Sequence, residues 1–250
     1  MPGKHDQEHR RLVESIRASA AYRPDRNKPP EVLSLPFEGT WLAANSPTRR
    51  VPSHGTHFLG QTFAIDFVKV NERRRSGLHR DWRTFLGTEP PDRFRGYEAP
   101  ILAPATGRVV RAHDGEVDHE ARRSILTLVP YLLTQGRRLR EGLDSLIGNH
   151  VILELRPGGP FVLMAHLRRG SLLVRADEQV EVGQQLARCG NSGNSTQPHV
   201  HIQVMGSPDL LETRGRLMAF RDYLAWPNRS GPPRNVAFGV PGERERIEPV

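Results

Sequence analysis

Residues 161–204 constrain the fold and chemistry of this chain more than any other stretch of its 250 residues. Within them, residues 199–204 read His-Val-His-Ile-Gln-Val. Successive side chains of a β-strand point to opposite faces of the sheet, so both histidines and Gln203 should share one face. Two imidazoles about 6–7 Å apart on one face can serve a single site, as two metal ligands or as a ligand and an acid–base group. An isolated pair of this kind is more often two polar residues facing solvent. Only the neighbouring sequence can distinguish this interpretation from a functional site.

The neighbouring sequence favours a site. Residues 161–167 form an apolar run that predicts a strand carrying His166 near its end. Residues 180–188 predict two short strands around a glycine turn, and a loop rich in glycine, asparagine and serine then leads to His199. Glycine and asparagine tolerate positive φ and allow close approach of a substrate backbone, so we expect Gly190–Gly193 to form one wall of a cleft.

The order of these features resembles that of the lysostaphin-type zinc metallopeptidases, the peptidoglycan endopeptidases of metallopeptidase family 23. The matching features are the strand end at His166, the segment 180–198 and the His-x-His strand; upstream, residues 99–110 resemble a hairpin of the same family. The resemblance covers roughly 63–204, broken by insertions. It implies a mainly β fold: an antiparallel sheet folded over on itself, of the duplicated hybrid motif or barrel-sandwich type.

The resemblance also implies a Zn²⁺ site. By position, Asp66 and His201 would be metal ligands, while His166 and His199 would be the catalytic pair that acts on water and on the tetrahedral intermediate. A catalytic zinc site keeps three protein ligands and one open position, where the metal acidifies water and polarises the scissile carbonyl. The alternative for Asp66 is a strand-end aspartate that only caps nearby backbone groups. The alternative for His166 is a histidine that is only the polar end of a core strand.

One position departs from the family pattern. The family places a histidine four residues before the aspartate, and here that residue is Thr62. A neutral threonine hydroxyl cannot replace an imidazole, so we expect a loop histidine to substitute. The candidates are His57, which we select, and His54. The cleft is expected to be lined by Asn191, Asn194 and Thr62.

Composition limits which other classes of function the chain can have. A net charge of +8 favours anionic partners such as nucleic acid, acidic membranes or wall polymers. Aromatic residues make up only 6% of the chain and do not interleave with the basic residues, which makes a nucleic-acid-binding β protein the weakest alternative. The single cysteine excludes an internal disulfide framework. No stretch is apolar enough to span a membrane, and the oligomeric state is left open.

The remaining sequence suggests three regions. We expect an N-terminal helix and Pro-rich linker over 1–36, a metallopeptidase-like β domain over 37–226 with insertions at about 71–98 and 114–148, and a loose tail over 227–250. Within them we expect a helix over 8–21, a partly helical stretch over 132–146, strands over 37–45, 62–70 and 149–155, a hairpin or strand pair over 100–112, and a strand or helix over 217–226.

The N-terminus has no apolar core of a secretory signal, which indicates a cytoplasmic protein, or a cell-wall protein if the true start lies elsewhere.

Two functions therefore lead. The first is a zinc-dependent endopeptidase that hydrolyses peptide bonds of peptidoglycan or similar short peptides, with a rebuilt first ligand. The second is a degenerate member of the family that binds or regulates without hydrolysis. Retention of His166, His199 and His201 favours the first, because a cleft that only binds has little need of all three. The missing histidine and the missing signal favour the second.

Overall fold

The computed structural model describes residues 4–25, 27–124, 126–127, 142–227 and 231–250, and over these the chain is mainly β, as predicted. The helices are α1 (Lys4–Ala21), η1 (Phe58–Phe63), α2 (Trp82–Leu86), η2 (Pro91–Arg93) and α5 (Leu143–Ile147). The strands are β1 (Glu31–Leu33), β2 (Trp41–Ala44), β3 (Ile65–Lys69), β4 (Pro100–Leu102), β5 (Gly107–His113), β6 (Asn149–Glu154), β7 (Phe161–Leu167), β8 (Gln179–Val180), β9 (Gln185–Arg188), β10 (Val200–Met205), β11 (Gly215–Arg216), β12 (Met218–Trp226), β13 (Arg234–Gly239) and β14 (Arg246–Pro249).

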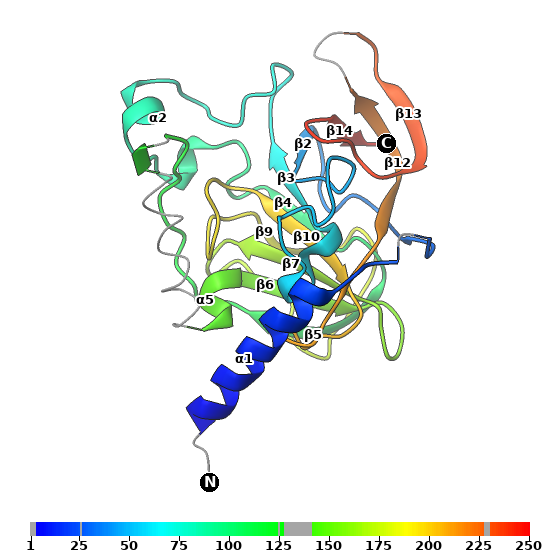
Figure 1. Cartoon of the computed structure of the whole chain (residues 1–250). Helices are drawn as coiled ribbons and strands as arrows, with labels where there is room; N and C mark the ends of the chain where they lie inside the picture. The colour runs from blue at the N-terminus through cyan, green and yellow to red at the C-terminus, as the bar shows by residue number, and fades with distance from the viewer. Residues whose placement is uncertain (1–3, 26, 125, 128–141, 228–230) are drawn as a thin grey trace.

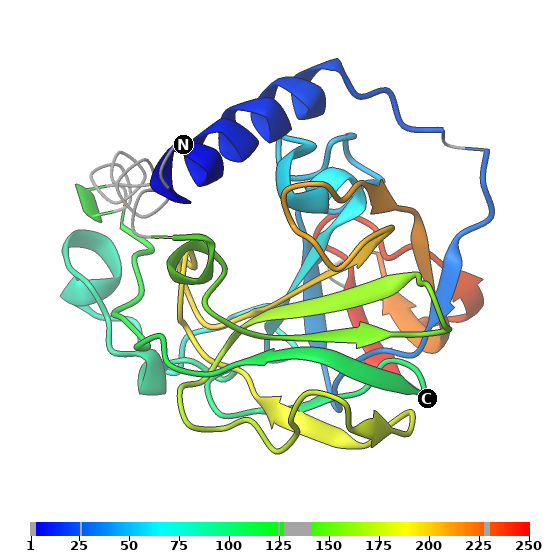
Figure 2. The same cartoon turned by 90° about the horizontal axis from the view of Figure 1, so that it is seen from below.

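Most of these strands form one large sheet. Its order is β1-β12-β14-β2-β3-β10-β7-β6-β5-β8, with β11 beside β10 and β13 beside β12. The pairings are antiparallel except that of β1 with β12. Strands β4 and β9 form a separate pair, and Figure 2 shows them on one side of the longer strands. The predicted antiparallel architecture is thus confirmed.

The central strands are buried on both faces, and the two faces differ in chemistry. Alternate residues of β7 and β10, such as Met164 and Ile202, point into the main hydrophobic core. The intervening residues face the other way, where a smaller apolar cluster contains Leu163 and Met205. The same alternation places His201 on this second face of β10. The sequence pattern therefore assigns the polar site and the smaller core to one face of the sheet.

The structure of the C-terminal segment shows that the prediction of a loose tail over 227–250 is wrong. Strand β13 pairs with β12, and β14 pairs with both β12 and β2. Ile247 is fully buried in the main core, and this burial explains why the segment is ordered despite its many polar residues. Figure 1 shows β14 in red beside β2, and β13 in orange beside β12.

The N-terminal region also differs from a simple linker. Strand β1 lies inside the predicted linker and pairs with β12, with Leu33 fully buried. Helix α1 starts four residues before the predicted helix, and its end lies next to η1 (Figure 1). Its Arg11 contacts Asp209, and Leu12 packs on the smaller core. No helix in the described part of the chain is both long and apolar enough to cross a membrane.

The segment predicted as a hairpin or strand pair, 100–112, contains two strands that do not pair with each other. Strand β4 pairs with β9, whereas β5 pairs with β6 and β8. The first predicted insertion carries α2 and η2. Most of the predicted helical stretch over 132–146 lies outside the described residues, and its described end is α5. The segment 217–226 is a strand, β12.

His150 on β6 should make stability depend on pH. Its side chain is fully buried, and burial lowers its pKa from 6.5 to about 4. The unfolded chain binds this proton more readily, so the stabilisation is complete above pH 6.5 and is lost as the pH falls towards 4, by about 3 kcal/mol. Urea unfolding at pH 7 and pH 4.5 should show this loss, and His150→Gln should reduce it. The exposed His79→Gln is the control; equal pH dependence in both variants would contradict the assignment.

Candidate metal centre and active site

The backbone register brings Asp66 and His201 together. Asp66 of β3 lies directly opposite His201 of β10, and Ala165 of β7 lies on the other side of His201. Residues directly opposite in antiparallel strands share a face, so the carboxylate and the imidazole meet. Nδ1 of His201 is 2.9 Å from Oδ1 of Asp66, and the other oxygen, Oδ2, accepts a hydrogen bond of 2.7 Å from Asn45 at the end of β2.

The remaining two predicted histidines join this pair. His199 precedes β10, and its Nε2 is 3.6 Å from Oδ1 of Asp66. The ring of His166 lies 4.8 Å from that of His199 and 5.9 Å from that of His201, centroid to centroid. His166 has φ 63°, which turns the strand end and its side chain away from regular β geometry. The structure thus brings together all four residues that the resemblance marked as ligands or catalytic groups.

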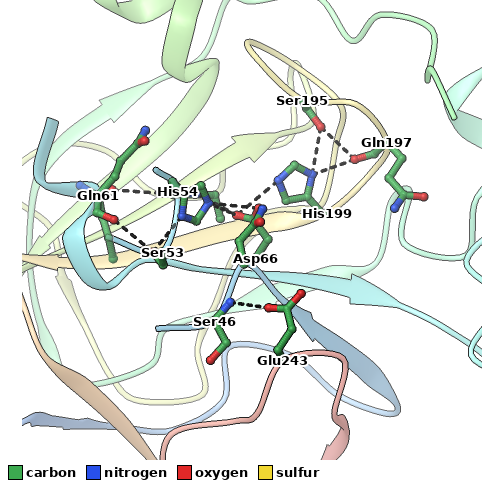
Figure 3. Close-up of polar contacts among 12 residues, drawn as sticks. Ser46, Ser53, His54, Gln61, Asp66, Ser195, Gln197, His199 and Glu243 are labelled. Carbon is green, nitrogen blue, oxygen red and sulfur yellow. Dashed lines mark hydrogen bonds and ion pairs between the residues drawn. The ribbon is translucent and has the colours of Figure 1, made fainter. Parts of the chain in front are cut away.

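His54, from the loop before η1, completes the cluster. Its Nε2 lies 3.1 Å from Oδ1 of Asp66, and its ring lies 4.8 Å from that of His201. One ligand atom from each of His54, Asp66 and His201 lies within 4.8 Å of the others. Figure 3 shows the His54 and His199 rings on either side of the Asp66 carboxylate.

The loop that carries His54 is held at both ends. The Ser53 hydroxyl donates to the carbonyl of Gln61, and the Ser53 amide donates to the carbonyl of Thr62. At the other end, the Ser46 amide donates to the Glu243 carboxylate, as Figure 3 shows. The C-terminal segment therefore supports the loop that delivers His54 to the site.

Hydrogen bonds outside the cluster orient the two imidazoles nearest Asp66. Because the Ser53 hydroxyl donates its proton to Gln61, it accepts from Nδ1 of His54, 3.0 Å away, and the lone pair of His54 is then on Nε2. Gln203 donates to the carbonyl of Leu59, so its own carbonyl oxygen accepts from Nε2 of His201 at 2.9 Å. The lone pair of His201 is then on Nδ1. Both lone pairs face Asp66.

His166 and His199, the pair expected to be catalytic, are oriented in the same way. Nδ1 of His166 donates to the carbonyl of Ser192 at 2.9 Å. Nδ1 of His199 donates to the carbonyl of Gln197 at 2.8 Å. In both rings Nε2 is left as the nitrogen that can exchange a proton. The glycine-rich loop thus supplies the backbone carbonyls that fix both histidines.

The cluster is electrostatically asymmetric. Burial alone would raise the pKa of Asp66, but His54, His199 and His201, when protonated, hold that pKa well below its ordinary value. Burial lowers the pKa of His166 well below its ordinary value, and the neighbouring His199 and His201 lower it further. Burial opposes the charge on His199 as well, yet the adjacent Asp66 raises its pKa overall. In this arrangement His166 is the neutral group and Asp66 the anion.

The donor set fits a zinc ion. Two imidazole nitrogens and one carboxylate oxygen converge, with the lone pairs of both imidazoles directed at the same anion. Without a cation or a proton between them these three acceptors repel one another, whereas zinc binds such nitrogen and oxygen donors and leaves a further position open in catalytic sites. The hydrogen bonds from Asn45 and to Gln203 are of the kind that orient metal ligands.

The other predicted site residues lie around this centre. Asn194 lines the cavity at the site. The structure corrects the placement of Thr62 and Asn191, which are fully buried supports: Thr62 contacts Nδ1 of His57 at 3.0 Å, and Asn191 donates to the carbonyl of His119. His57 packs its ring on Tyr22 and lies outside the group of His54, Asp66 and His201.

Comparison with known proteins gives one family match. Residues 133–211 match the model of peptidase family M23. The match includes His166, His199 and His201, whereas Asp66 and His54 precede it.

Several solved structures are similar to this chain. The catalytic domain of lysostaphin from Staphylococcus simulans has 16% identity and a TM-score of 0.35, covering 62% of this chain and 77% of that one. A putative peptidase M23 from Pseudomonas aeruginosa has 19% identity and a TM-score of 0.38, covering 82% and 57% respectively. The catalytic domain of an M23 protein from Enterococcus faecalis has 19% identity and a TM-score of 0.33, covering 60% and 87%.

Gln203 offers a test of how the candidate metal site orients His201. Gln203→Leu removes the acceptor for Nε2–H of His201, so we expect zinc affinity to fall about 10- to 100-fold. Gln203→Glu keeps that acceptor and should retain the affinity. Gln185→Leu, on the distant strand β9, is the control. Competition with a chromophoric chelator measures each affinity, and unchanged affinity in Gln203→Leu would contradict the proposed orientation of His201.

Proposed function

We propose that the chain is a zinc-dependent endopeptidase that hydrolyses peptide bonds of peptidoglycan or similar short peptides. The observation that carries this proposal is the convergence of His54, Asp66 and His201, with His166 and His199 beside them. The family match over residues 133–211 supports a metallopeptidase-type activity. His54 takes the role that the family pattern gives to a histidine at the position of Thr62.

The residues of the site would have three different chemical roles. His54, Asp66 and His201 would hold zinc, which when bound acidifies water and polarises a carbonyl group. His166 is neutral and presents Nε2 to the cavity, so it can accept a proton or donate one at that atom. His199 presents Nε2 on the side of Asp66 and, when protonated, can stabilise an oxyanion by a hydrogen bond.

The direct test is hydrolysis of purified peptidoglycan and of short synthetic peptides, followed by mass spectrometry of the products. We expect cleavage that is lost after chelation and restored by added zinc. The alternative function, a binding or regulatory module of the same fold, predicts association with peptidoglycan and no cleaved product under any metal condition. That outcome would reject the enzymatic proposal.

A further inference from the structure

The cavity at the site has two chemically different halves. Its volume is about 430 Å³. The polar half of its lining presents the histidines and Asp66, together with residues such as Arg50, Gln61 and Asn194. The other half is lined by apolar side chains, namely Phe58, Leu59, Leu146, Ile147, Leu163 and Leu210.

The apolar half begins directly beside the proposed metal ligands. Across the sheet, Ala165 is the neighbour of His201, and Leu163 is the neighbour of Gln203. Both apolar residues belong to the smaller core that lies on this face. Phe58 and Leu146 pack on the same core but are only half-buried, and both line the cavity. The smaller core therefore opens into the site.

The contacts of α5 hold this wall in place. The amide of Asn194 donates to the carbonyl of Leu146 at 2.8 Å. Gly193 has φ +69°, and a Cβ there would lie 2.4 Å from the amide nitrogen of Gly148. The loop that leads to His199 is thus pressed against the end of α5, so one contact positions both the apolar wall and the catalytic histidine. A preformed pocket of this kind binds without a large ordering cost.

We propose that the apolar half binds an aliphatic or aromatic side chain of a residue flanking the scissile bond. The inference rests on the proposed function and narrows it, because it selects peptides with a bulky apolar residue over runs of glycine. Burial of a leucine side chain against this wall should favour a leucine peptide over a glycine peptide about 10- to 100-fold. A lysine side chain at the same place would lose its hydration without gaining an ionic partner from the wall.

Hydrolysis of matched peptides tests the preference. The zinc-loaded chain is assayed with acetyl-tetraglycine amide and with versions that carry leucine or lysine on either side of the scissile bond. We expect the best leucine peptide to exceed the glycine and lysine peptides about 10- to 100-fold in kcat/KM. Equal kcat/KM for leucine and glycine would overturn the inference while leaving the proposed function intact.

Two substitutions in α5 form a matched pair. Leu146 lines the cavity at the site, whereas Leu143, also half-buried and in contact with the smaller core, lines a neighbouring cavity. Leu146→Asn should reduce the leucine-to-glycine ratio to near one, and Leu143→Asn should preserve it. Because the ratio compares two peptides on one variant, a partial loss of folded protein does not change it. The same ratio in both variants would overturn the inference.

A second measurement is independent of zinc and of hydrolysis. Methyl NMR spectra of the zinc-free chain are recorded with acetyl-leucine amide and with acetyl-lysine amide. We expect the leucine probe alone to shift the methyl signals of Leu146, Leu163 and Ala165, and this effect should disappear in Leu146→Asn. If these shifts occur but no peptide is cleaved, the pocket is supported and the proposed function fails. If the leucine probe causes no shifts, the pocket is refuted.

Discussion

Replacing His54 by alanine is expected to abolish measurable zinc binding, whereas replacing His57 should leave it unchanged. The reason is the position of each imidazole. Nε2 of His54 lies 3.1 Å from Asp66, while Nδ1 of His57 is engaged with Thr62. Loss of a ligand should lower affinity by more than the roughly 10- to 100-fold that follows from losing a hydrogen-bond partner of a ligand.

These two histidines form a stringent comparison because they lie three residues apart in the same loop. Zinc affinity is measured by chelator competition for the wild type and both variants, with circular dichroism to confirm that each is folded. Retained affinity in His54→Ala together with loss in His57→Ala would show that the loop rearranges on binding zinc and that His57 is the ligand.

Replacing His166 by alanine should spare zinc but remove most of the hydrolysis. His166 lines the cavity and its Nδ1 is held by the Ser192 carbonyl, yet it lies outside the group of three proposed ligands. Proton transfer by a positioned side chain typically contributes about 10²- to 10⁴-fold to rate. We therefore expect kcat to fall by this range, with zinc stoichiometry unchanged.

The control for His166 is His119, whose Nε2 contacts the carbonyl of Gly193 in the same loop and which lies outside the proposed site. His119→Ala should change kcat far less than His166→Ala does. A His166 variant with full kcat would remove this residue from the catalytic role and leave His199 as the remaining candidate for proton transfer.

The part of the site that follows from β-strand alternation was predictable. In the segment 199–204 the period of two residues placed His201 and Gln203 on one face, and the register of β3 and β10 places Asp66 opposite His201. The smaller apolar core shares that face for the same reason. Local sequence fixes which face a strand residue occupies. The register that places Asp66 opposite His201 joins strands far apart in sequence, and the expectation that these two residues meet came from the family resemblance.

The position of His54 was not predictable in this way. Its loop runs from 46 to 60 without regular periodicity, and contacts with Gln61 and Glu243, near and far in sequence, set its course. The sequence indicated that either His54 or His57 substitutes for the missing ligand, and the fold places the first of these beside Asp66. The strands of the C-terminal segment were not predicted for a related reason. Strand β14 pairs with β2, which is far away in sequence, as well as with β12, and β13 pairs with β12.

We expect this chain to hold one zinc ion through His54, Asp66 and His201. Native mass spectrometry of the purified protein, after incubation with zinc and removal of excess metal, tests it most directly. We predict one zinc per chain in the wild type and none in His201→Ala. A wild-type chain without zinc, or a His201→Ala variant that keeps one, would contradict the claim.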